Sequence, residues 1–272
     1  MNKGISVDRD LCTKCNMCAA VCPMSLISPA DEALLPDMPD AKEAFCIECG
    51  HCEASCPPGA LTLRGSEPGE RYPAAGCSIE PECLGIYMKS RRSVRHYKPE
   101  PVSRETISKI LDIARYAASG GNGQPVEWLV IHDKMEVKRI ARLTVDWMRE
   151  LAKSGHPMAS YAPMLIGAWE SGTDVICRGA PHLIIPHIPR DNPIAPTDAI
   201  IALTHVDLAA PSFGVGTCWA GFVAGASASY QPLQDALALP KGRVAGYAMM
   251  LGYPQYTSYR IPRRKQQKVT WR

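Results

Sequence analysis

Eight cysteines between Cys12 and Cys56 constrain this chain more than any other feature of its sequence. They form two copies of the pattern C-x-x-C-x-x-C-x-x-x-C-P, one from Cys12 to Pro23 and one from Cys46 to Pro57. A cubane iron–sulfur cluster needs four thiolates around one small pocket, and three cysteines spaced by two residues wrap a loop around it. The pattern therefore predicts two 4Fe-4S clusters held by Cys12, Cys15, Cys18, Cys22, Cys46, Cys49, Cys52 and Cys56.

The spacing also predicts which cysteines share a cluster. In two-cluster ferredoxins the fourth cysteine of each run ligates the cluster of the other run. We therefore expect one cluster on Cys12, Cys15, Cys18 and Cys56, and the other on Cys46, Cys49, Cys52 and Cys22. Zinc and disulfides are the alternatives. Zinc sites take separated C-x-x-C pairs, and a disulfide framework belongs to secreted chains, so both are disfavoured.

Composition and charge narrow the class of protein. With 272 residues, 46% of them hydrophobic, the chain can build two domains with real cores. The first residues are polar and no run of eighteen apolar residues occurs, which predicts a cytoplasmic protein without a membrane partner. Residues 1–70 carry five Lys and Arg against eleven Asp and Glu, a net charge of −6, whereas residues 71–272 carry twenty-five against sixteen, or +9. The change of sign indicates a domain boundary.

The sequence divides into a ferredoxin-like 4Fe-4S domain at 1–70, a linker at 71–85 and a second domain at 86–272. Short strands are expected on either side of the cysteine motifs, at 5–7 and 61–63. The linker is rich in Gly, Pro and Ser, and it holds Cys77 and Cys83, which read as free thiols or packing residues. Basic residues of the second domain are scattered without stacking aromatic residues, so nucleic acid is not expected as a partner.

The second domain alternates helices and strands irregularly. Ser103 is a plausible N-cap for a helix reaching Ala118. Further helices are expected at 134–153, 196–210 and 233–239, with strands at 127–132, 181–186 and 243–251 and an irregular excursion over 154–178. There is neither a regular β-α-β rhythm nor a G-x-G-x-x-G fingerprint, so a Rossmann fold is not supported.

Two basic clusters, Arg91–Arg95 and Arg263–Lys265, lie at opposite ends of this second domain. Arginine and serine together suit a phosphate monoester, because the guanidinium binds it in a bidentate way and the hydroxyl adds one more hydrogen bond. Two solvated charged patches are the plain alternative.

Four segments of the second domain resemble the nitroreductase family of flavoproteins, and the whole chain resembles the ferredoxin-fused branch of that family. They are Arg91–Arg95, Ser119–Pro125, Gly214–Gly221 and Arg260–Lys265, and they occur in the family's order. The resemblance implies an α+β fold, a bacterial ferredoxin-like domain followed by a nitroreductase-like FMN-binding domain. It also implies a homodimer with FMN at the subunit interface.

The resemblance further implies which residues bind FMN. Arg91 and Ser93 would hold the phosphate or ribityl chain, Arg92 between them would also bind FMN, and Arg95 would lie near N1 and O2 of the ring. Arg264 and Lys265 would close on the phosphate from the C-terminal side. The remaining residues implied are Gly120, Asn122 and Gln124, which would reach the flavin of the other subunit, and Ala220 and Gly221, whose backbone N–H groups would approach O4 and N5.

Several other residues have two interpretations. Cys218 is either a packed small residue beside the flavin or a nucleophile. His182 and His187 are either hydrogen-bonded core residues or substrate contacts. Tyr161 and Trp169 could form a lid or belong to the core.

The function predicted is an FMN-dependent oxidoreductase. A ferredoxin or another low-potential donor would supply single electrons through two 4Fe-4S clusters, and a planar, electron-poor small molecule such as a nitro compound, quinone or enone would accept them. Catalytic residues stay unknown, because no acid–base dyad is evident. The alternatives are an NAD(P)H-driven nitroreductase or flavin reductase, an electron-transfer or redox-sensing protein without turnover, and a ligand-transforming relative.

Overall fold

The computed structural model describes residues 4–64, 76, 78–155 and 157–272. Linker positions 71–75 and 77, and with them Cys77, lie outside this range. The chain forms two compact units, the first Met1–Ser78 with Gly121–Gly123, the second Ile79–Gly120 with Gln124–Arg272. The first unit thus ends inside the predicted linker 71–85.

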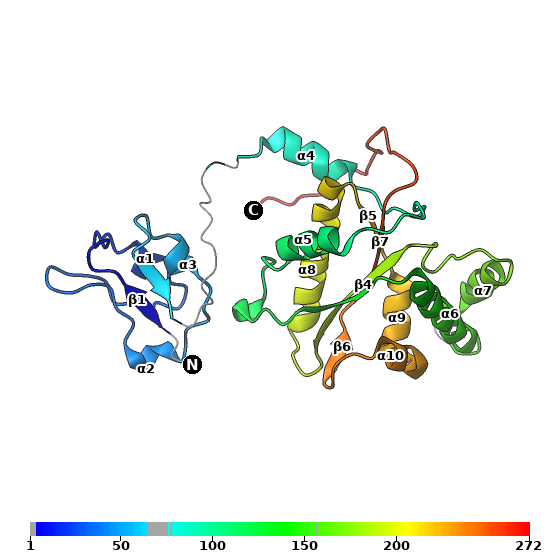
Figure 1. Cartoon of the computed structure of the whole chain (residues 1–272), viewed down its shortest axis with the longest axis horizontal. Helices are drawn as coiled ribbons and strands as arrows, with labels where there is room; N and C mark the ends of the chain where they lie inside the picture. The colour runs from blue at the N-terminus through cyan, green and yellow to red at the C-terminus, as the bar shows by residue number, and fades with distance from the viewer. Residues whose placement is uncertain (1–3, 65–75, 77, 156) are drawn as a thin grey trace. The chain divides into compact units, whose positions relative to one another are not determined.

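The first unit is a small cysteine-rich module. Strand β1 (Ile5–Val7) pairs antiparallel with β2 (Leu61–Leu63), as predicted, and short helices α1 (Met17–Val21), α2 (Asp40–Glu43) and α3 (His51–Ala54) lie between them in the sequence (Figure 1). Both strands alternate between buried and exposed side chains, so one face of the hairpin packs inward. Its core consists of Ile5, Leu26, Ile27, Met38, Leu61 and Leu63 together with Cys18, Cys46 and Cys52.

The second unit is built on a five-stranded antiparallel sheet with β4 (His182–Pro189) inside it. The other strands are β3 (Glu127–Ile131), β5 (Gly216–Trp219), β6 (Arg243–Ala245) and β7 (Met249–Gly252). The order is β3-β4-β7-β5, and β6 extends the sheet beside β4. Strand β4 is an almost continuous apolar run, which fits a strand buried on both faces.

Helices cover both faces of this sheet (Figure 1). Ile184 of β4 packs with α5 (Arg104–Ala114) and α8 (Ala195–Ala209). Its neighbours Leu183 and Ile185 point the other way, toward a core shared by α6 (Lys134–Leu151), α7 (Ala162–Glu170), α9 (Gly221–Ser229) and α10 (Gln231–Leu237). The result is a three-layer α+β unit, because successive strand residues face opposite sides.

Local signals decided where several helices begin. Ser103 caps α5, since its hydroxyl accepts the Thr106 N–H at 3.1 Å, as predicted. Asp133 caps α6 by accepting the N–H groups of Met135 and Glu136. Helix α5 ends at Ala114 and does not reach Ala118, because a turn precedes the glycine-rich loop and its short η1 helix (Gly120–Asn122).

Three other parts of the second unit differ from the prediction. The excursion 154–178 contains η2 (Pro157–Ser160) and helix α7, in which Pro163 occupies the first turn, where proline is tolerated. Helix α9 was not predicted. The expected strand 243–251 is divided into β6 and β7 around Gly246, where a Cβ would lie 2.6 Å from the Ala199 Cβ.

The two ends of the second unit lie on its surface. Helix α4 (Pro81–Ser90) has no buried residue, and its Tyr87 hydroxyl donates to the Leu208 carbonyl oxygen at 2.6 Å. Short η3 (Ala210–Phe213) joins α8 to β5. After β7 the chain pairs with residues 96–98, and residues 257–272 then run exposed without helix or strand. No helix in the described ranges is both long and apolar enough to cross a bilayer.

Candidate functional site

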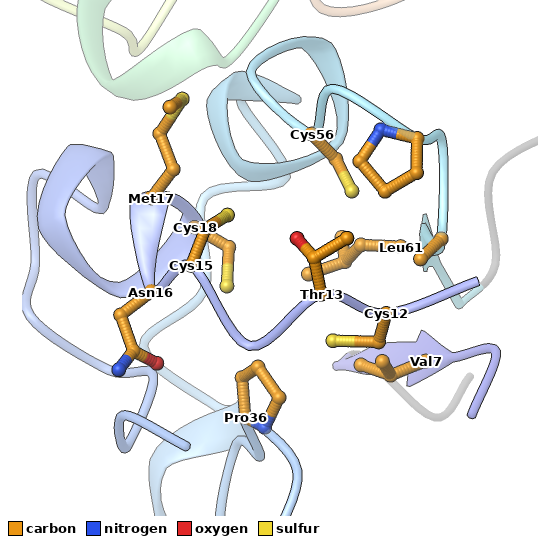
Figure 2. Close-up of a pocket in the computed structure, with 12 residues that line it drawn as sticks. Val7, Cys12, Thr13, Cys15, Asn16, Met17, Cys18, Pro36, Cys56 and Leu61 are labelled. Carbon is orange, nitrogen blue, oxygen red and sulfur yellow. The ribbon is translucent and has the colours of Figure 1, made fainter. Parts of the chain in front are cut away.

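In the first unit, four cysteines border one cavity. Cys12, Cys15, Cys18 and Cys56 line it together with apolar residues that include Val7 and Leu61, and its empty volume is about 330 Å³. Figure 2 shows their side chains around this common space. The structure therefore brings three cysteines of the first motif together with the last cysteine of the second.

The other four cysteines border a second cavity of the same size. Cys22, Cys46, Cys49 and Cys52 line it, with Ile27, Met38 and Leu63 among the apolar residues around them, and its empty volume is also about 330 Å³. Each cavity thus takes three thiols from one motif and one from the other.

The backbone between the cysteines repeats from one motif to the next. Lys14 and Asn16 flank Cys15 with φ values of 54° and 59°, and Glu48 and Gly50 flank Cys49 with φ values of 53° and 75°. Left-handed residues at these two places turn the chain around the second cysteine of each motif. Asn16 also holds the intervening loop, since its amide donates to the Ala30 carbonyl at 3.1 Å and accepts the Ala30 N–H at 2.6 Å.

The chemistry of both cavities fits an iron–sulfur cluster. Burial raises the pKa of Cys18 and raises that of Cys52 to about 11, because an apolar wall disfavours the thiolate. A bound metal reverses this preference, since its positive charge deprotonates the coordinating thiol. A mononuclear zinc site needs ligands that converge on one point. Within the described ranges, no three His, Cys, Asp or Glu side chains are placed to hold a single ion.

In the second unit, the segment Arg91–Arg95 lies against the end of strand β5. Ser93 forms a parallel bridge with Thr217, and the Val94 N–H donates to the Thr217 carbonyl at 2.8 Å. A Cβ on Gly216 would lie 2.5 Å from a Val94 methyl group, so only glycine allows this approach. Two of the four segments implied in flavin binding, Arg91–Arg95 and Gly214–Gly221, are therefore adjacent.

The cations of this segment have different surroundings. Arg91 pairs with the buried Asp207 of α8 at 3.3 Å, and its side chain is 26% exposed. Arg92 is partly exposed, whereas Arg95 is exposed and donates to the Ser93 carbonyl at 3.4 Å. Burial raises the pKa of the Cys218 thiol, although Arg95 and Arg178 act in the opposite direction. Cys218 is therefore a buried thiol that favours its neutral form.

The loop before β3 is held in an unusual backbone conformation. The Gly120 N–H donates to the buried carboxylate of Asp198 at 3.0 Å, and a Cβ on Gly120 would lie 2.6 Å from an Ile194 methyl group. Gln124 has a φ of 43° and donates its N–H to the Ser119 hydroxyl at 3.0 Å. Asn122 has a φ of 54°. Gln124, Ser119 and Asp198 help to line a hollow of about 470 Å³.

The β5–α9 junction offers one of the two backbone donors that the resemblance implies. The Ala220 N–H donates to the Ala248 carbonyl at 2.9 Å, so it is already used inside the fold. Gly221 begins α9, where the first N–H groups have no acceptor within the helix. A Cβ on Gly221 would lie 3.3 Å from the Tyr247 hydroxyl. The structure therefore favours Gly221 over Ala220 as a donor to a ligand.

The remaining predicted residues are spread over the second unit. Arg264 and Lys265 lie in the exposed C-terminal segment. Tyr161 is 61% exposed at the start of α7, whereas Trp169 packs against the core. His187 accepts a hydrogen bond from the Arg243 guanidinium at 2.9 Å.

The interpretation of His182 as a hydrogen-bonded core residue is confirmed, but sequence reasoning missed its partners and missed the buried Asp207. The rings of His132 and His182 stack 4.1 Å apart, and the Val102 N–H donates to His182 Nε2 at 2.8 Å. Asp207 is 5% exposed on the buried face of α8, beside Arg91. An acidic residue within the mostly apolar sequence of α8 was the signal that could have revealed Asp207.

Comparison with known proteins assigns the second unit. Residues 88–253, more than half of the chain, match the model of the nitroreductase family. The chain belongs to the nitroreductase family. Residues 11–61 match a 4Fe-4S dicluster domain, so this nitroreductase carries an iron–sulfur domain before its oxidoreductase fold.

Individual relatives support this assignment. The chain is 30% identical to FMN reductase [NAD(P)H] of Bacillus subtilis over 186 residues, covering 67% of this chain and 70% of the relative. The structure of a nitroreductase with bound FMN from Desulfitobacterium hafniense matches with a TM-score of 0.57 and 25% identity, over 69% of this chain and 97% of the other. An FMN-dependent nitroreductase from Clostridium difficile matches at 20% identity and a TM-score of 0.56, over 71% and 100%, which shows the fold alone.

Proposed function

We propose that this nitroreductase is an FMN-dependent oxidoreductase that receives electrons through two 4Fe-4S clusters and reduces a planar, electron-poor molecule. A nitro compound, a quinone or an enone is a suitable acceptor. The observation that carries the proposal is the division of eight cysteines into two apolar four-thiol cavities, in a chain whose second unit has the nitroreductase fold. When bound, the clusters would carry single electrons and the flavin would deliver a pair.

The cysteines would hold the clusters as the cavities group them. Cys12, Cys15, Cys18 and Cys56 would ligate one cluster, and Cys22, Cys46, Cys49 and Cys52 the other. The left-handed turns around Cys15 and Cys49 would orient the thiols inward. The acidic first unit suits a low-potential electron carrier with a basic docking face as donor, because opposite charges speed encounter.

For FMN, the fit rests on the adjacency of Arg91–Arg95 and β5. Arg91, Arg92 and Ser93 would bind the phosphate or ribityl chain, and Arg95 would place a positive charge beside N1 and O2, favouring negative charge on the ring. Gly221 would offer its backbone N–H to O4 or N5, and Ala220 its small size. The FMN-bound relative from Desulfitobacterium hafniense supports this proposal.

We further propose that the flavin site is completed in a homodimer. Gly120, Asn122, Gln124, Arg264 and Lys265 would reach FMN from the partner subunit or from the C-terminal segment. Large apolar side chains are exposed on α4 and on the C-terminal segment, among them Ile86 at 60%, Tyr259 at 90% and Trp271 at 89%. Exposed apolar area of this kind is typical of surfaces covered in an oligomer.

The test is an anaerobic preparation analysed for iron, sulfide and FMN, then titrated with dithionite and assayed with nitro and quinone acceptors. We expect about eight iron atoms per chain, from two four-iron clusters, and one FMN. We expect the FMN absorbance to bleach when the reductant is added without acceptor, and to return when the acceptor is added. Zinc in place of iron, or a preparation that does not bind FMN, would refute the proposal.

A second candidate is reduction driven by NAD(P)H, which the name of the Bacillus subtilis relative favours. Rapid mixing with NADPH or NADH separates the two routes. Fast flavin bleaching supports the NAD(P)H-driven enzyme. Bleaching only with a reduced ferredoxin supports entry through the clusters.

A further inference from the structure

Asp207 is a buried carboxylate at the centre of a small network in the second unit. It is 5% exposed on helix α8. Its oxygens accept hydrogen bonds from the Thr217 hydroxyl and from the Trp219 indole N–H, the latter at 3.1 Å, and they pair with the Arg91 guanidinium at 3.3 Å. Three donors from two separate segments therefore converge on one side chain.

This arrangement fixes the Arg91 side chain without using all of it. A buried carboxylate is costly unless donors compensate it, so Asp207 binds its three partners firmly. A guanidinium carries five N–H donors, and the contact with Asp207 uses Nη1. The Arg91 side chain stays 26% exposed, so its remaining donors can bind a second anion. The carboxylate sets the direction in which those donors point.

The same carboxylate also holds the end of strand β5. The Thr217 carbonyl oxygen accepts the Val94 N–H, which joins the arginine segment to the strand, and the Thr217 hydroxyl donates to Asp207. Asp207 is therefore connected to the arginine segment through Thr217 as well as through Arg91. The Trp219 ring packs edge-to-face on Tyr247, with ring centroids 5.2 Å apart. The Tyr247 hydroxyl lies 3.3 Å from where a Cβ on Gly221 would be. Contacts thus run from Arg91 through Asp207 and Trp219 to Tyr247, whose hydroxyl lies beside Gly221.

We infer that Asp207 is a positioning residue of the flavin site, which orients Arg91 toward the FMN phosphate and holds Trp219 at the end of β5, next to the β5–α9 junction. The inference rests on the proposed function, because it takes Arg91 as a phosphate ligand. Asp207 itself would not touch FMN. Its removal should weaken recognition of the phosphate more than recognition of the ring.

The experiment compares FMN with riboflavin, which has the same ring but no phosphate. Dissociation constants of both are measured for the full-length protein after removal of its flavin, in wild type and in Asp207→Asn, which is isosteric but uncharged. We expect the wild type to prefer FMN strongly. In Asp207→Asn, FMN binding should weaken about ten-fold or more, by loss of one charge-assisted contact, while riboflavin binding changes little.

Asp146→Asn is the matched control. Asp146 is also a carboxylate that pairs with an arginine, Arg149 on α6 at 2.5 Å, but neither residue is placed at the flavin. A general loss of packing would affect both variants and both flavins alike, so the ratio of the FMN and riboflavin constants should stay near the wild-type value in Asp146→Asn. Thermal unfolding of each variant records any structural damage separately.

Asp207→Glu keeps the test decisive if Asp207→Asn does not fold. Glutamate retains the charge but displaces the carboxylate by one methylene group, so the preference for FMN should again fall. An unchanged ratio in a folded Asp207 variant, with FMN still bound by the wild type, overturns this inference and leaves the proposed function standing. A wild type that binds neither flavin overturns both.

Discussion

The two units of this nitroreductase carry their candidate functional groups in opposite ways. In the first unit, eight cysteines within 45 residues of sequence surround two cavities, and short turns alone bring them together. In the second, the candidate groups come from segments between Arg91 and Lys265, and a sheet with helices on both faces is needed to bring even two of these segments together. A site built from one short segment can be predicted from the spacing of its residues in the sequence. A site built from distant segments can be recognised only once the fold is known.

The largest expected effect tests how completely the cysteine cavities depend on both motifs. Cys56→Ala removes a thiol from the cavity of the first motif, and Cys22→Ala removes one from the cavity of the second. We expect each variant to lose about half of its iron, since each cavity would hold a four-iron cluster. Iron analysis and low-temperature electron paramagnetic resonance after reduction would show which cluster is lost.

Cys83→Ala is the matched control for these variants, because Cys83 is exposed on α4 and lies outside both cavities. It should keep its full iron content. Equal spectra from Cys56→Ala and Cys22→Ala, or full iron in either one, would contradict the division of the thiols between two cavities.

The next effect probes the distributed site through its exposed cation. Arg95→Ala removes the charge proposed to lie beside N1 and O2. We expect FMN affinity to fall by about 1.5 to 3 kcal/mol, the range for a hydrogen bond to a charged group, and the flavin reduction potential to become more negative. Fluorescence titration and a spectroelectrochemical measurement would check both.

For comparison, Arg139→Ala removes a cation that pairs with Glu136 on the surface of α6. Its flavin affinity and potential should match the wild type. If Arg95→Ala matches it as well, the basic segment after α4 is a solvated patch and not part of the site.

A smaller effect concerns pH and the stacked histidines of the second unit. Burial, with a smaller contribution from His132, lowers the pKa of His182 to about 4. The unfolded chain therefore binds a proton near pH 6.5 that the folded chain refuses, so stability is complete above pH 6.5 and falls as the pH drops toward 4. The loss should be on the order of 3 kcal/mol, since the pKa falls from 6.5 to about 4 and one unit of pKa is worth about 1.4 kcal/mol.

Tryptophan fluorescence measures this loss in the second unit alone, because Trp128, Trp147, Trp169, Trp219 and Trp271 all lie there. Urea unfolding is followed in pH steps of about 0.5, roughly a fifth of the change in pKa. These measurements give the slope of the free energy of unfolding against pH. His182→Gln keeps a polar side chain that does not titrate, so its slope between pH 6.5 and 4 should be smaller. Parallel slopes would assign the pH dependence to other groups.

The smallest effect is that of a single helix cap. Ser103→Ala removes the hydroxyl that accepts the Thr106 N–H at the start of α5. We expect a loss of about 1 kcal/mol in the free energy of unfolding. Ser108→Ala, an exposed site within the same helix, should be neutral or slightly stabilising, because alanine has the higher helix propensity. Denaturant unfolding followed by tryptophan fluorescence gives the free energy of unfolding of both variants. Equal values would show that the Ser103 cap does not stabilise this helix.

The parts of the fold that sequence could predict share one property, namely that a short window contains the cause. The strands at 5–7 and 61–63 and the cap at Ser103 are of this kind. Helix α7 was read as irregular because Pro163 and Gly167 are usually breakers, yet Pro163 falls in the first turn, where it costs little. The division at Gly246 comes from close approach of Ala199, which no local pattern reveals.

The candidate site shows the same limit. The sequence resemblance led to Arg91 and to Ala220, but not to the carboxylate that pairs with Arg91 or to the carbonyl that already accepts the Ala220 N–H. Both partners come from distant elements, α8 and the residue before β7. Such contacts are set by tertiary packing, so one-dimensional spacing could not reveal them.

The left-handed turns beside Cys15 and Cys49 explain how the two motifs can differ in their letters. Three of the four residues that adopt this backbone, Lys14, Asn16 and Glu48, are not glycine, although the conformation costs about 1 kcal/mol or more for most side chains. Their side chains make different contacts, such as the hydrogen bonds of Asn16 with Ala30, although the backbone follows the same path in both motifs. The backbone conformation therefore limits which residues these positions tolerate more than side-chain chemistry does. Glycine should be accepted at each of them, and valine or isoleucine should not.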